Sequence, residues 1–588
     1  MTKEDLEKLK KIGVKSPLEL ALIKPKEWED NFLYPYITFS PQAFEAQVLE
    51  IRKSKVTRVK FFLKNINQIM WGVFFQFKKW HEGVFKEGNT LYIRGEIRQN
   101  QLIQPKPISR INEITPVYKT PLNQRTLKSL IKKYVTLNNL SQLPQNIATR
   151  LFFMHFPRNK EDINEKEITY ALKWAEIYNH LKKLSFKKKS FPSIPVQSDP
   201  KEFINALPFK LTNDQLKVIK EIQQDISKKT QARRVIIGDV GSGKTIVMLA
   251  TAFMAKKSII MCPTSILANQ IYEEANKFLK KFNFKITLVT QKSKFKKEDI
   301  QTSNLLIGTH ALLYQNLPRV NVIMVDEQHR FGTNQRAMLE KLTSQGNILP
   351  HYFQFSATPI PRTQALIMSS FVNVSLIKEL PFKKDIKTQI ISKEDFKDLI
   401  NHIQNEISKG NQIVIVYPLV EESKNFKYQS IEEGKDFWLK YFDKVYITHG
   451  KDKNKEDILV EFREKGNILI TTTVIEVGIS LPKLTTIVIV GAERLGLATL
   501  HQLRGRVGRY GQKGYCFLYT HDKNNKRLKA FASTLDGFKI AELDLEFRKS
   551  GDLLDGKAQS GESFKYFDEV RDLHILEEVK RYLTSHTS

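Results

Sequence analysis

Short runs of alternating hydrophobic and polar positions occupy the chain from about residue 41 to residue 120. A side-chain period of two is typical of strands that bury one face. The pattern predicts five strands, at residues 44–54, 57–65, 70–77, 89–99 and 101–108. Five short strands joined by turns suit a small Greek-key barrel such as an OB-fold.

The segments before and after these strands differ in their hydrophobic spacing. Residues 1–30 predict short helices, and residues 121–190 predict a mostly helical segment. Residues 190–200 contain three prolines and are typical of a linker between domains. Farther along, β-branched runs alternate with helical patterns, which indicates α/β domains built on parallel sheets.

Composition then narrows the class of ligand. The 588 residues are 41% hydrophobic, enough for several packed cores, and carry a formal net charge of +31. Residues 51–140 hold 18 Lys and Arg against 4 Asp and Glu. This excess disfavours an enzyme for small neutral substrates and favours a polyanion, either nucleic acid or an anionic membrane. A basic, aromatic-rich barrel suits nucleic acid, through a basic groove and base stacking.

Cysteine usage and hydropathy predict the compartment. Cys262 and Cys516 are the only cysteines, which excludes a disulfide framework or a zinc ribbon, and both read as small buried hydrophobic residues. No apolar stretch reaches the length of a membrane-spanning helix, and the N-terminus lacks the apolar core of a secretory signal. We therefore expect a soluble protein in the reducing cytoplasm.

A glycine-rich loop follows the strand-like run that begins at residue 234. Its sequence, GDVGSGKT, fits the G-x-x-x-x-G-K-[ST] pattern of a phosphate-binding loop. The glycines let backbone N–H groups surround phosphate oxygens, and the next helix N-terminus adds positive potential. Lys244 is placed to reach the β- and γ-phosphates, and the Thr245 hydroxyl to hold Mg²⁺. The predicted ATP-binding residues of the loop are Gly238, Asp239, Val240, Gly241, Ser242, Gly243, Lys244 and Thr245.

Two carboxylates follow another buried strand, at residues 321–325. Hydrolysis of a phosphoanhydride needs a ligand for the metal and a base for the attacking water. Asp326 is predicted to hold Mg²⁺, and Glu327 to orient and deprotonate the water. Together with Lys244, Glu327 belongs to the predicted catalytic set.

Three arginines lie in HQLRGRVGR, at residues 501–509, after a predicted strand at residues 485–492. Arginine side chains stabilise the negative charge that develops on a transferred γ-phosphoryl group. Arg506 and Arg509 are the predicted fingers, because interleaved glycines allow close approach. Their distance from the phosphate loop predicts a second α/β domain that closes on the first.

Two more segments place hydroxyl groups after strands. Ser356 and Thr358 lie in SATPIPRT, behind the strand-like HYFQF, and are predicted to couple the γ-phosphate state to domain movement. Residues 468–480 add a strand and a Thr/Glu/Gly turn that faces the cleft. Hydroxyls after strands are common, so the order of these segments along the chain is the informative feature.

The order of these motifs resembles that of a superfamily-2 helicase. The resemblance is carried by GDVGSGKT, PTSILANQ, GTHALL, DEQHR, SATPIPR, TTTVIEVG and QLRGRVGR. In finer detail, DEQHRFG, SATPIPRT, ERLGLATLHQLRGRVGR and LDGFKIAELDLEFR are similar to the RecG family, the branched-DNA helicases of bacteria. The resemblance covers the whole chain, is sharp from residue 207 to about residue 561, and is looser in residues 1–200.

The resemblance implies a multidomain α/β fold with an N-terminal wedge and two RecA-like helicase domains on parallel sheets. The expected divisions are an N-terminal helical segment at 1–40, an OB-fold wedge domain at 41–120, a helical connector at 121–205, an ATP-binding RecA-like domain at 206–380, a second RecA-like domain at 381–525, and a translocation hairpin with a C-terminal tail at 526–588.

Further ligand contacts are implied by the family. Gln215 would read the adenine edge, Phe209 would pack beside the base, and Gln502 would contact the γ-phosphate region. The implied cofactors are ATP and Mg²⁺. Hydroxyls and amides of two motifs would hold the DNA backbone without reading sequence. These implied DNA contacts are Pro263, Thr264, Thr309 and His310.

A helical hairpin and loop that couple ATP hydrolysis to translocation are implied at residues 535–561, with Arg548 and Gln559 as coupling residues. The family usually reads R-G-P-G-E where this chain reads RKSGD, at residues 548–552. Losing a glycine and a proline changes the backbone options of that loop. Ser480 stands where the family usually has aspartate, so we assign it no catalytic role.

In the family the barrel is a wedge that splits a fork, and aromatic side chains stack on bases at the branch. Phe75 lines up with such a residue, and Trp80 lies nearby in sequence. Regular alternation would place Phe75 and Phe77 on one face of their strand and Phe74 on the other. Phe75 and Trp80 are therefore the predicted stacking residues.

The sequence thus predicts an ATP-dependent duplex-DNA translocase that remodels forks and Holliday junctions in recombination and repair. Two alternatives stay open: a general DNA or RNA unwinding helicase, and a transcription-repair coupling translocase. A junction-binding protein with a relic nucleotide site is disfavoured, because Lys244, Glu327, Arg506 and Arg509 are all present. Expected partners are branched and duplex DNA, and no membrane. The resemblance adds single-strand DNA-binding protein, a monomeric state and a bacterial, nucleoid-associated location.

Overall fold

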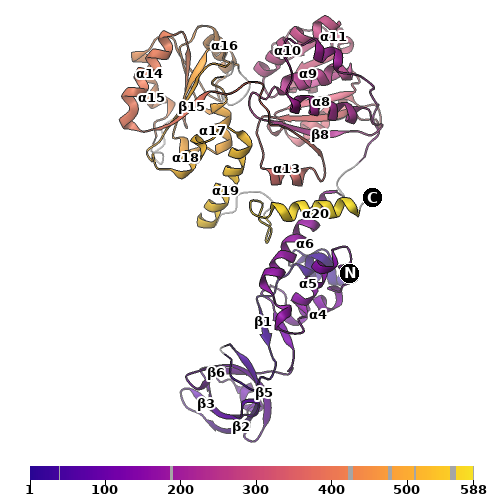
Figure 1. The fold of residues 1–588 in the computed structure, drawn as a ribbon, viewed down its shortest axis with the longest axis vertical. Coiled ribbons are helices and arrows are strands. Elements are labelled where there is room, and N and C mark those ends of the chain that lie inside the picture. The colour runs from indigo at the N-terminus through magenta and orange to yellow at the C-terminus, as the bar shows by residue number, and fades with distance from the viewer. Residues whose placement is uncertain are drawn as a thin grey trace. The chain divides into compact units, whose positions relative to one another are not determined.

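The chain forms two compact units, which we describe separately (Figure 1). The first unit contains Met1–Lys183 and Glu562–Ser588, and the second contains Leu184–Gly561. The computed structural model describes residues 1–38, 40–185, 190–420, 428–473, 480–508, 511–555 and 564–586, without the side chains of His329, Thr333 and residues 549–555.

Five strands of the first unit close into a barrel. They are β2 (Gln42–Arg52), β3 (Thr57–Leu63), β4 (Gln68–Phe74), β5 (Thr90–Arg98) and β6 (Gln101–Pro107). The closed order is β2-β3-β4-β6-β5, and the short helix α3 (Lys79–Val84) separates β4 from β5 in the sequence. This order matches the predicted OB-fold. Val59, Phe61 and Leu63 alternate with more exposed residues and fill the barrel, as a strand period of two requires.

Helices and a two-stranded sheet make up the rest of the first unit. The elements are α1 (Lys3–Lys10), α2 (Pro17–Ala21), β1 (Glu27–Asp30), β7 (Ile114–Val117), α4 (Gln124–Tyr134), α5 (Gln145–His155), α6 (Glu165–Ser185) and α20 (Leu573–Ser585). β1 and β7 pair antiparallel. Trp174 of α6 is fully buried, so this long helix is the centre of the helical part.

The C-terminal helix α20 packs on α6. Glu578 accepts hydrogen bonds from the Tyr170 hydroxyl at 2.5 Å and from the Trp174 indole N–H at 3.3 Å. Lys173 forms an ion pair with Asp572 at 2.8 Å. The segment predicted as one at residues 526–588 is therefore divided, because its last part belongs to the first unit.

The second unit has two lobes, each built on a parallel sheet. The first lobe contains seven strands in the order β10-β11-β9-β12-β13-β8-β14. Their bounds are β8 (Arg233–Gly238), β9 (Ser258–Met261), β10 (Ile286–Val289), β11 (Leu305–Gly308), β12 (Val322–Asp326), β13 (His351–Ser356) and β14 (Asn373–Ile377). Every residue of β12 is buried, which is typical of parallel strands covered on both faces.

Helices cover both faces of this sheet (Figure 1). Core contacts place α8 (Asn213–Ile226), α9 (Lys244–Ala255) and α10 (Ser265–Leu279) on one face, and α11 (Lys297–Thr302) and α12 (Thr333–Thr343) on the other. The short helices α7 (Lys201–Asn205) and α13 (Arg362–Met368) complete the lobe.

The second lobe has six parallel strands in the order β15-β20-β19-β16-β18-β17. The strands are β15 (Ile386–Ile391), β16 (Gln412–Val416), β17 (Val445–Thr448), β18 (Ile468–Thr471), β19 (Leu484–Val490) and β20 (Gly514–Tyr519). The helices are α14 (Phe396–Ser408), α15 (Ile431–Tyr441), α16 (Lys455–Lys465), α17 (Leu497–Arg504), α18 (Lys526–Ala532) and α19 (Gly537–Asp555). The two parallel α/β domains and the helical hairpin, α18 with α19, match the predicted architecture.

Residues 190–200 pack along the first lobe, although their prolines predict a linker. The Ser193 N–H donates to Lys229 O at 2.8 Å, and the Ser193 hydroxyl donates to Leu349 O at 2.7 Å. The Val196 N–H donates to Ile226 O at 2.8 Å. The prolines lack N–H groups, and the non-proline residues between them supply these bonds.

Candidate functional site

The phosphate loop connects β8 to α9 in the first lobe. Gly241 and Gly243 have φ angles of 82° and 76°, in the left-handed region that favours glycine. A Cβ on Gly238 would lie 2.4 Å from Ser242 Oγ, so the turn requires glycine there as well. Ser242 Oγ is buried and has no hydrogen-bond partner among the described residues. A buried polar atom in a loop of this shape fits a phosphate oxygen.

Lys244 begins α9 and points into the loop. Its Nζ donates to Gly238 O at 2.9 Å and to Asp239 O at 3.0 Å. Burial lowers the pKa of Lys244, while the nearby carboxylates of Glu327 and Asp326 act to raise it. The ammonium group is thus held against loop carbonyls, where stronger phosphate acceptors can replace them.

Asp326 ends β12 in the middle of the sheet. Burial raises the pKa of Asp326 to about 7, and the negative charge of Glu327 adds to this rise. A buried carboxyl whose charged form is costly gains from a neighbouring cation. Thr245, half-buried at the start of α9, is the hydroxyl predicted to share that cation. The donor set of Asp326 and Thr245 therefore fits Mg²⁺, which prefers oxygen ligands and keeps several waters.

Glu327 has left-handed backbone angles, with φ at 47° and ψ at 53°. Such a conformation costs about 1 kcal/mol or more for a non-glycine residue and persists where the surroundings hold it. The Glu327 N–H donates to Phe355 O at 2.9 Å, and Glu327 Oε1 accepts from the Ala357 N–H at 3.0 Å. The carboxylate is thereby connected to SATPIPR, the segment that follows β13.

Gln215 contacts the phosphate loop directly. Its Oε1 accepts from the Thr212 N–H at 2.9 Å, completing a capping box at the start of α8. Its Nε2 donates to Ser242 O at 2.9 Å. Both ends of the amide are bonded to protein, so Gln215 supports the loop in this structure. Phe209 is 46% exposed and its ring centroid lies 6.0 Å from that of Phe278, and its packing on a base stays a prediction.

The two lobes meet at the phosphate loop. Gln502 of α17 donates from Nε2 to Thr358 Oγ1 at 2.6 Å. A Cβ on Gly505 would lie 2.7 Å from Val240 Cγ1, so the turn after α17 rests on the loop and must be glycine. Arg506 is the next residue and is half-buried at this contact. Arg509, the second predicted finger, lies outside the described residues.

Sequence reasoning missed two residues of this interface, His501 and Arg504. The arginine spacing alone does not separate Arg504 from Arg506, but Arg504 is the last residue of α17 and is 1% exposed. It donates to Phe531 O at 3.0 Å and Thr534 O at 2.7 Å, and its guanidinium lies 4.0 Å from the Phe531 ring centroid. Arg504 thus attaches α17 to the hairpin.

The predicted DNA-backbone contacts differ in accessibility. The Thr264 hydroxyl caps α10 by accepting from the Leu267 N–H at 3.2 Å, directly after Pro263. Thr309 is 3% exposed, and its hydroxyl accepts from the Ala311 N–H at 3.4 Å. His310 is exposed. The four contacts stay predictions, with His310 the most accessible side chain.

Helix α19 is attached to α17 through Asp544. Asp544 Oδ1 accepts from the Leu497 N–H, at the start of α17, at 3.1 Å. Arg548, one turn later on α19, forms an ion pair with Asp544 at 2.6 Å and is itself 62% exposed. The arrangement joins the predicted coupling residue Arg548 to the helix that carries Gln502. Gln559 lies outside the described residues.

On the barrel, Phe75 is 65% exposed and Trp80 is 51% exposed. They line a shallow pocket of about 710 Å³ with Lys78 and Lys106. The expected pairing of Phe75 with Phe77 on one face was wrong. β4 ends at Phe74, so the alternation stops there, and Phe77 turns back to pack on Phe74 with ring centroids 5.3 Å apart. Phe75 alone of the three is directed outward.

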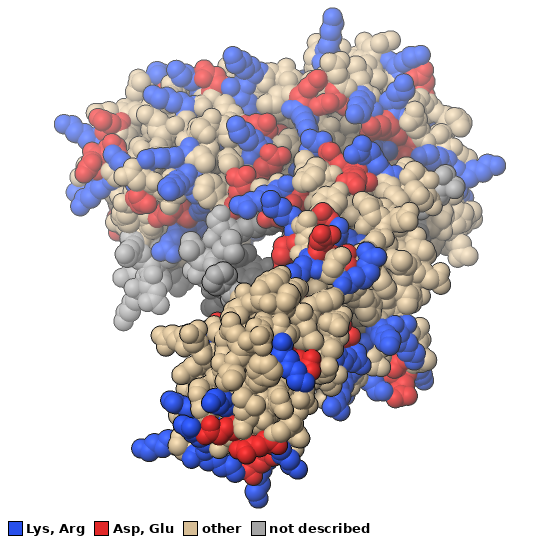
Figure 2. Space-filling view, turned by 60° about the horizontal axis from the view of Figure 1, so that its bottom comes forward, with Lys and Arg blue, Asp and Glu red and all other residues tan. Residues whose placement is uncertain are grey.

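Basic side chains surround the outer barrel face as well. Arg52 lies 4.8 Å and Lys60 lies 5.7 Å from the ring centroid of Trp71. Figure 2 shows Lys and Arg side chains over both units on the face drawn, with acidic side chains among them. On this face the basic side chains are interspersed with acidic ones and do not form one continuous patch (Figure 2).

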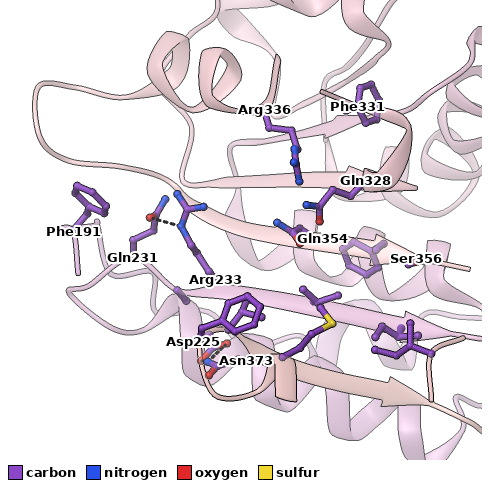
Figure 3. A pocket seen from close by; sticks show the side chains of 18 of the residues that line it. Phe191, Asp225, Gln231, Arg233, Gln328, Phe331, Arg336, Gln354, Ser356 and Asn373 are labelled. Carbon is purple, nitrogen blue, oxygen red and sulfur yellow. Dashed lines mark hydrogen bonds between the residues drawn. The ribbon is translucent and has the colours of Figure 1, made fainter. Parts of the chain in front are cut away.

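A cavity of about 850 Å³ lies on the first lobe near the nucleotide motifs (Figure 3). Gln328, Arg336 and Gln354 lie beside one another in it, and Ser356 and Thr358 also line it. Among the described residues, none of the phosphate loop lines it. This cavity is thus separate from the phosphate cradle, although it reaches the segments that follow β12 and β13.

Two absences complete the description. Within the described parts of the chain, no helix is both long and apolar enough to cross a bilayer. The same residues contain no cluster of three or more His, Cys, Asp or Glu side chains that could hold a metal ion.

Comparison with known proteins gives consistent matches to helicases. The family described as DEAD/DEAH box helicase matches residues 212–367, and the helicase conserved C-terminal domain matches residues 394–511. The ATP-dependent DNA helicase RecG of Helicobacter pylori is 45% identical over 97% of this chain and 96% of its own length. The RecG of Aquifex aeolicus is 33% identical over 95% of this chain and 80% of its own length.

The chain belongs to the RecG family of ATP-dependent DNA helicases. A solved structure of RecG bound to a three-way DNA junction supports the same assignment. It covers 99% of this chain and 84% of its own, with a TM-score of 0.58 and 25% identity. The RecG fold thus includes both the barrel and the two lobes described above.

Proposed function

We propose that this RecG-family protein hydrolyses ATP between its two lobes and uses the free energy to move on duplex DNA and remodel forks and Holliday junctions. The contact between the lobes carries this proposal: the turn after α17 rests on the phosphate loop, and Gln502 reaches Thr358. A nucleotide between these elements has ligands from both lobes, so its binding and hydrolysis change their separation.

The nucleotide chemistry is assigned to residues of both lobes. The loop N–H groups and Lys244 bind the phosphates. Thr245 and Asp326 would hold Mg²⁺, which would neutralise part of the negative charge of the phosphates. Glu327 orients the attacking water and accepts its proton. Arg506 and Arg509 stabilise negative charge on the transferred group. Phe209 packs beside the base, and Gln215, which supports the loop in this structure, reads the base edge when its amide exchanges a protein partner for the base.

The barrel is assigned the role of a wedge. Phe75 and Trp80 are exposed aromatic rings with Lys78 and Lys106 between them, a combination that binds nucleic acid by stacking and charge without reading sequence. The DNA junction in the solved RecG structure belongs to that relative. We infer the same class of ligand here because the barrel combines exposed rings with a local excess of basic residues.

Coupling of hydrolysis to movement is assigned to the hairpin. Arg548 and Asp544 connect α19 to the first turn of α17, the helix that ends at the arginine motif. Thr358 provides the corresponding connection in the first lobe through Gln502, and Ser356 Oγ accepts from the Thr358 N–H at 3.1 Å. We further propose that the protein acts as a monomer in the nucleoid and meets single-strand DNA-binding protein at forks, as its family resemblance implies.

The decisive experiment measures ATP hydrolysis in the presence of a Holliday junction, a fork, linear duplex, single-stranded DNA and RNA. We expect the greatest stimulation by branched DNA, because only branched DNA engages the wedge and the lobes together. Stimulation by RNA equal to that by branched DNA would instead support a general unwinding helicase. Stimulation by linear duplex equal to that by forks would remove the wedge from the proposal.

Two variants test the active site in the same assay. Lys244→Ala and Glu327→Gln are expected to lower turnover at least 100-fold, since one removes a phosphate ligand and the other the base. Junction binding, measured by fluorescence anisotropy, should change less than threefold.

Phe75→Ala should lower fork preference and leave hydrolysis without DNA unchanged, and Ile69→Ala, another exposed barrel residue, is its matched control.

A further inference from the structure

Asp239, the second residue of the phosphate loop, makes different contacts through its main chain and its side chain. Its backbone carbonyl accepts from Lys244 Nζ at 3.0 Å, so the main chain belongs to the nucleotide cradle. Its side chain is 4% exposed and is directed away from that lysine contact, toward the second lobe. The loop therefore carries a buried carboxylate whose partners lie largely outside its own lobe.

Four groups surround this carboxylate. Oδ1 accepts from the Val240 N–H at 2.6 Å and from His501 Nε2 at 2.5 Å. Oδ2 lies 3.4 Å from the Gly537 N–H and 3.4 Å from Lys384 Nζ, whose side chain is 7% exposed. Against the effect of burial, His501, Lys384 and the Val240 N–H hold the pKa of Asp239 well below its usual range. Only Val240 belongs to the loop, and the other three come from later in the chain.

His501 is oriented by its other ring nitrogen. Arg504 Nη2 lies 3.3 Å from His501 Nδ1, and a guanidinium can only donate. Nδ1 therefore accepts, and the ring proton is carried by Nε2, which donates to Asp239. Arg504 also donates to Thr534 O at 2.7 Å, three residues before α19 begins. Asp239, His501, Arg504 and the turn between α18 and α19 thus form one continuous hydrogen-bonded chain.

Gly537 is the first residue of α19 and approaches this cluster more closely than any side chain allows. A Cβ there would lie 2.7 Å from Asp239 Oδ1 and 2.7 Å from His501 Nε2, below the distance at which real Cβ atoms occur. The missing side chain lets the first N–H of α19 reach the carboxylate. A negative charge at a helix N-terminus is stabilising, because it meets the positive end of the helix dipole.

We propose that Asp239 is a positioning residue that ties the phosphate loop to the first turn of α19, so that a change in the loop is passed to the translocation helix directly. The route is distinct from the connection through Gln502 and Thr358, which joins the lobes but does not touch α19. The proposal rests on the proposed function, because it concerns how hydrolysis is coupled to movement on DNA.

Gly537→Ala provides the test, with two measurements on one preparation: ATP hydrolysed with junction DNA, and the rate of junction unwinding. The added Cβ separates α19 from the loop and leaves the nucleotide ligands in place. We expect turnover and the KM for ATP to stay within about threefold, and unwinding to slow at least tenfold. The ATP consumed per junction unwound then rises about threefold or more. Gly450→Ala, where a Cβ meets open space, should leave both rates unchanged.

Two outcomes would overturn the proposal. Turnover and unwinding could fall by the same factor, which would make the cluster a general support of the lobe interface. Neither could change, which would make the contact dispensable. Unmodified protein in the same assay tests the proposed function separately. If it fails to unwind junctions, the proposed function is refuted, whatever the variants show about Asp239.

A second variant keeps the test independent of folding. His501→Ala removes the strongest partner of Asp239 without adding atoms, and circular dichroism with thermal melting shows whether each variant is folded. Both variants act through Asp239. The double variant should therefore raise the ATP consumed per junction by less than the product of the two single increases. Independent, multiplicative effects of His501→Ala and Gly537→Ala would contradict a shared route through the carboxylate.

Discussion

Burial shifts the pKa of several individual residues. Burial and the neighbouring carboxylate of Glu327 raise the pKa of Asp326 to about 7, whereas His501, Lys384 and the Val240 N–H lower the pKa of Asp239 against the effect of its burial. His155 shows the opposite effect on a base. It is fully buried between the Tyr118 hydroxyl at 2.7 Å and Ala21 O at 3.0 Å. The carbonyl of Ala21 must accept, so Nε2 carries the proton and Nδ1 accepts from Tyr118.

His155 predicts a pH dependence for the first unit. Burial lowers its pKa from 6.5 to about 4, so between these values the unfolded chain binds a proton that the folded chain does not. Stability is therefore complete above pH 6.5 and falls as the pH drops toward 4, by about 3 kcal/mol for this group. Thermal unfolding from pH 7.5 to pH 4.5 measures the slope.

His155→Gln keeps both hydrogen bonds without a titrating ring and should flatten that slope. The exposed His574 is the matched control, and His574→Gln should leave the slope unchanged. An equally steep slope in His155→Gln would show that other groups cause the acid sensitivity.

Single elements connect the nucleotide site to the hairpin. Gln502 of α17 contacts the first lobe. His501 of the same helix contacts the phosphate loop, and Arg504 contacts the hairpin. At the first turn of α17, the Leu497 N–H donates to Asp544. α17 therefore contacts both the first lobe and the hairpin, the parts that the proposed coupling connects. Its partner α19 is held at one end by Asp239 and, about two turns later, by the bond from the Leu497 N–H to its own Asp544, which also pairs with Arg548 on the same helix.

Arg548→Ala is expected to separate hydrolysis from movement. Loss of the guanidinium removes the ion pair to Asp544, the residue that binds the Leu497 N–H of α17, but leaves Asp544 itself. ATP turnover with junction DNA should stay within about threefold, while fork regression, followed by gel mobility of labelled strands, falls at least tenfold. Lys539→Ala, an exposed cation on the same helix, is the matched control. Normal regression by Arg548→Ala would refute its coupling role.

At the scale of the whole molecule, the second unit is inserted into the sequence of the first. Residues 184–561 leave the helical part after α6, and the chain returns so that α20 packs on α6 again. Both ends of the two-lobed unit are therefore attached to the unit that carries the barrel.

Removing residues 564–588 is expected to destabilise the first unit selectively. Ile575, Leu576 and Val579 are buried, and burial of three such side chains stabilises by roughly 5 kcal/mol. The thermal transition of the first unit should fall, whereas hydrolysis without DNA, a property of the second unit, should persist. Thr584→Ala, at an exposed position of α20, is the control. An unchanged melting profile would show that α20 is not part of the folded core of that unit.

Much of the fold and site follows from local pattern. The barrel strands, the α/β lobes, the phosphate loop and Asp326 with Glu327 are predictable because each depends on neighbours in sequence: alternation, glycine spacing, or a carboxylate after a buried run. Phe75 could be singled out but Phe77 could not be placed, because the end of β4 at Phe74 depends on packing against Phe85 and His81.

By itself the sequence determined which chemistry the chain carries and in what order its domains occur. Only the tertiary structure decided what joins them: the Asp239 side chain to His501 and Gly537, Arg504 to the hairpin, Gln215 to the phosphate loop, and α20 to α6. Such contacts join residues up to about 400 positions apart, as in the bond between Tyr170 and Glu578. No periodicity or spacing encodes them, because long-range contacts arise only when separate hydrophobic cores bring distant elements together.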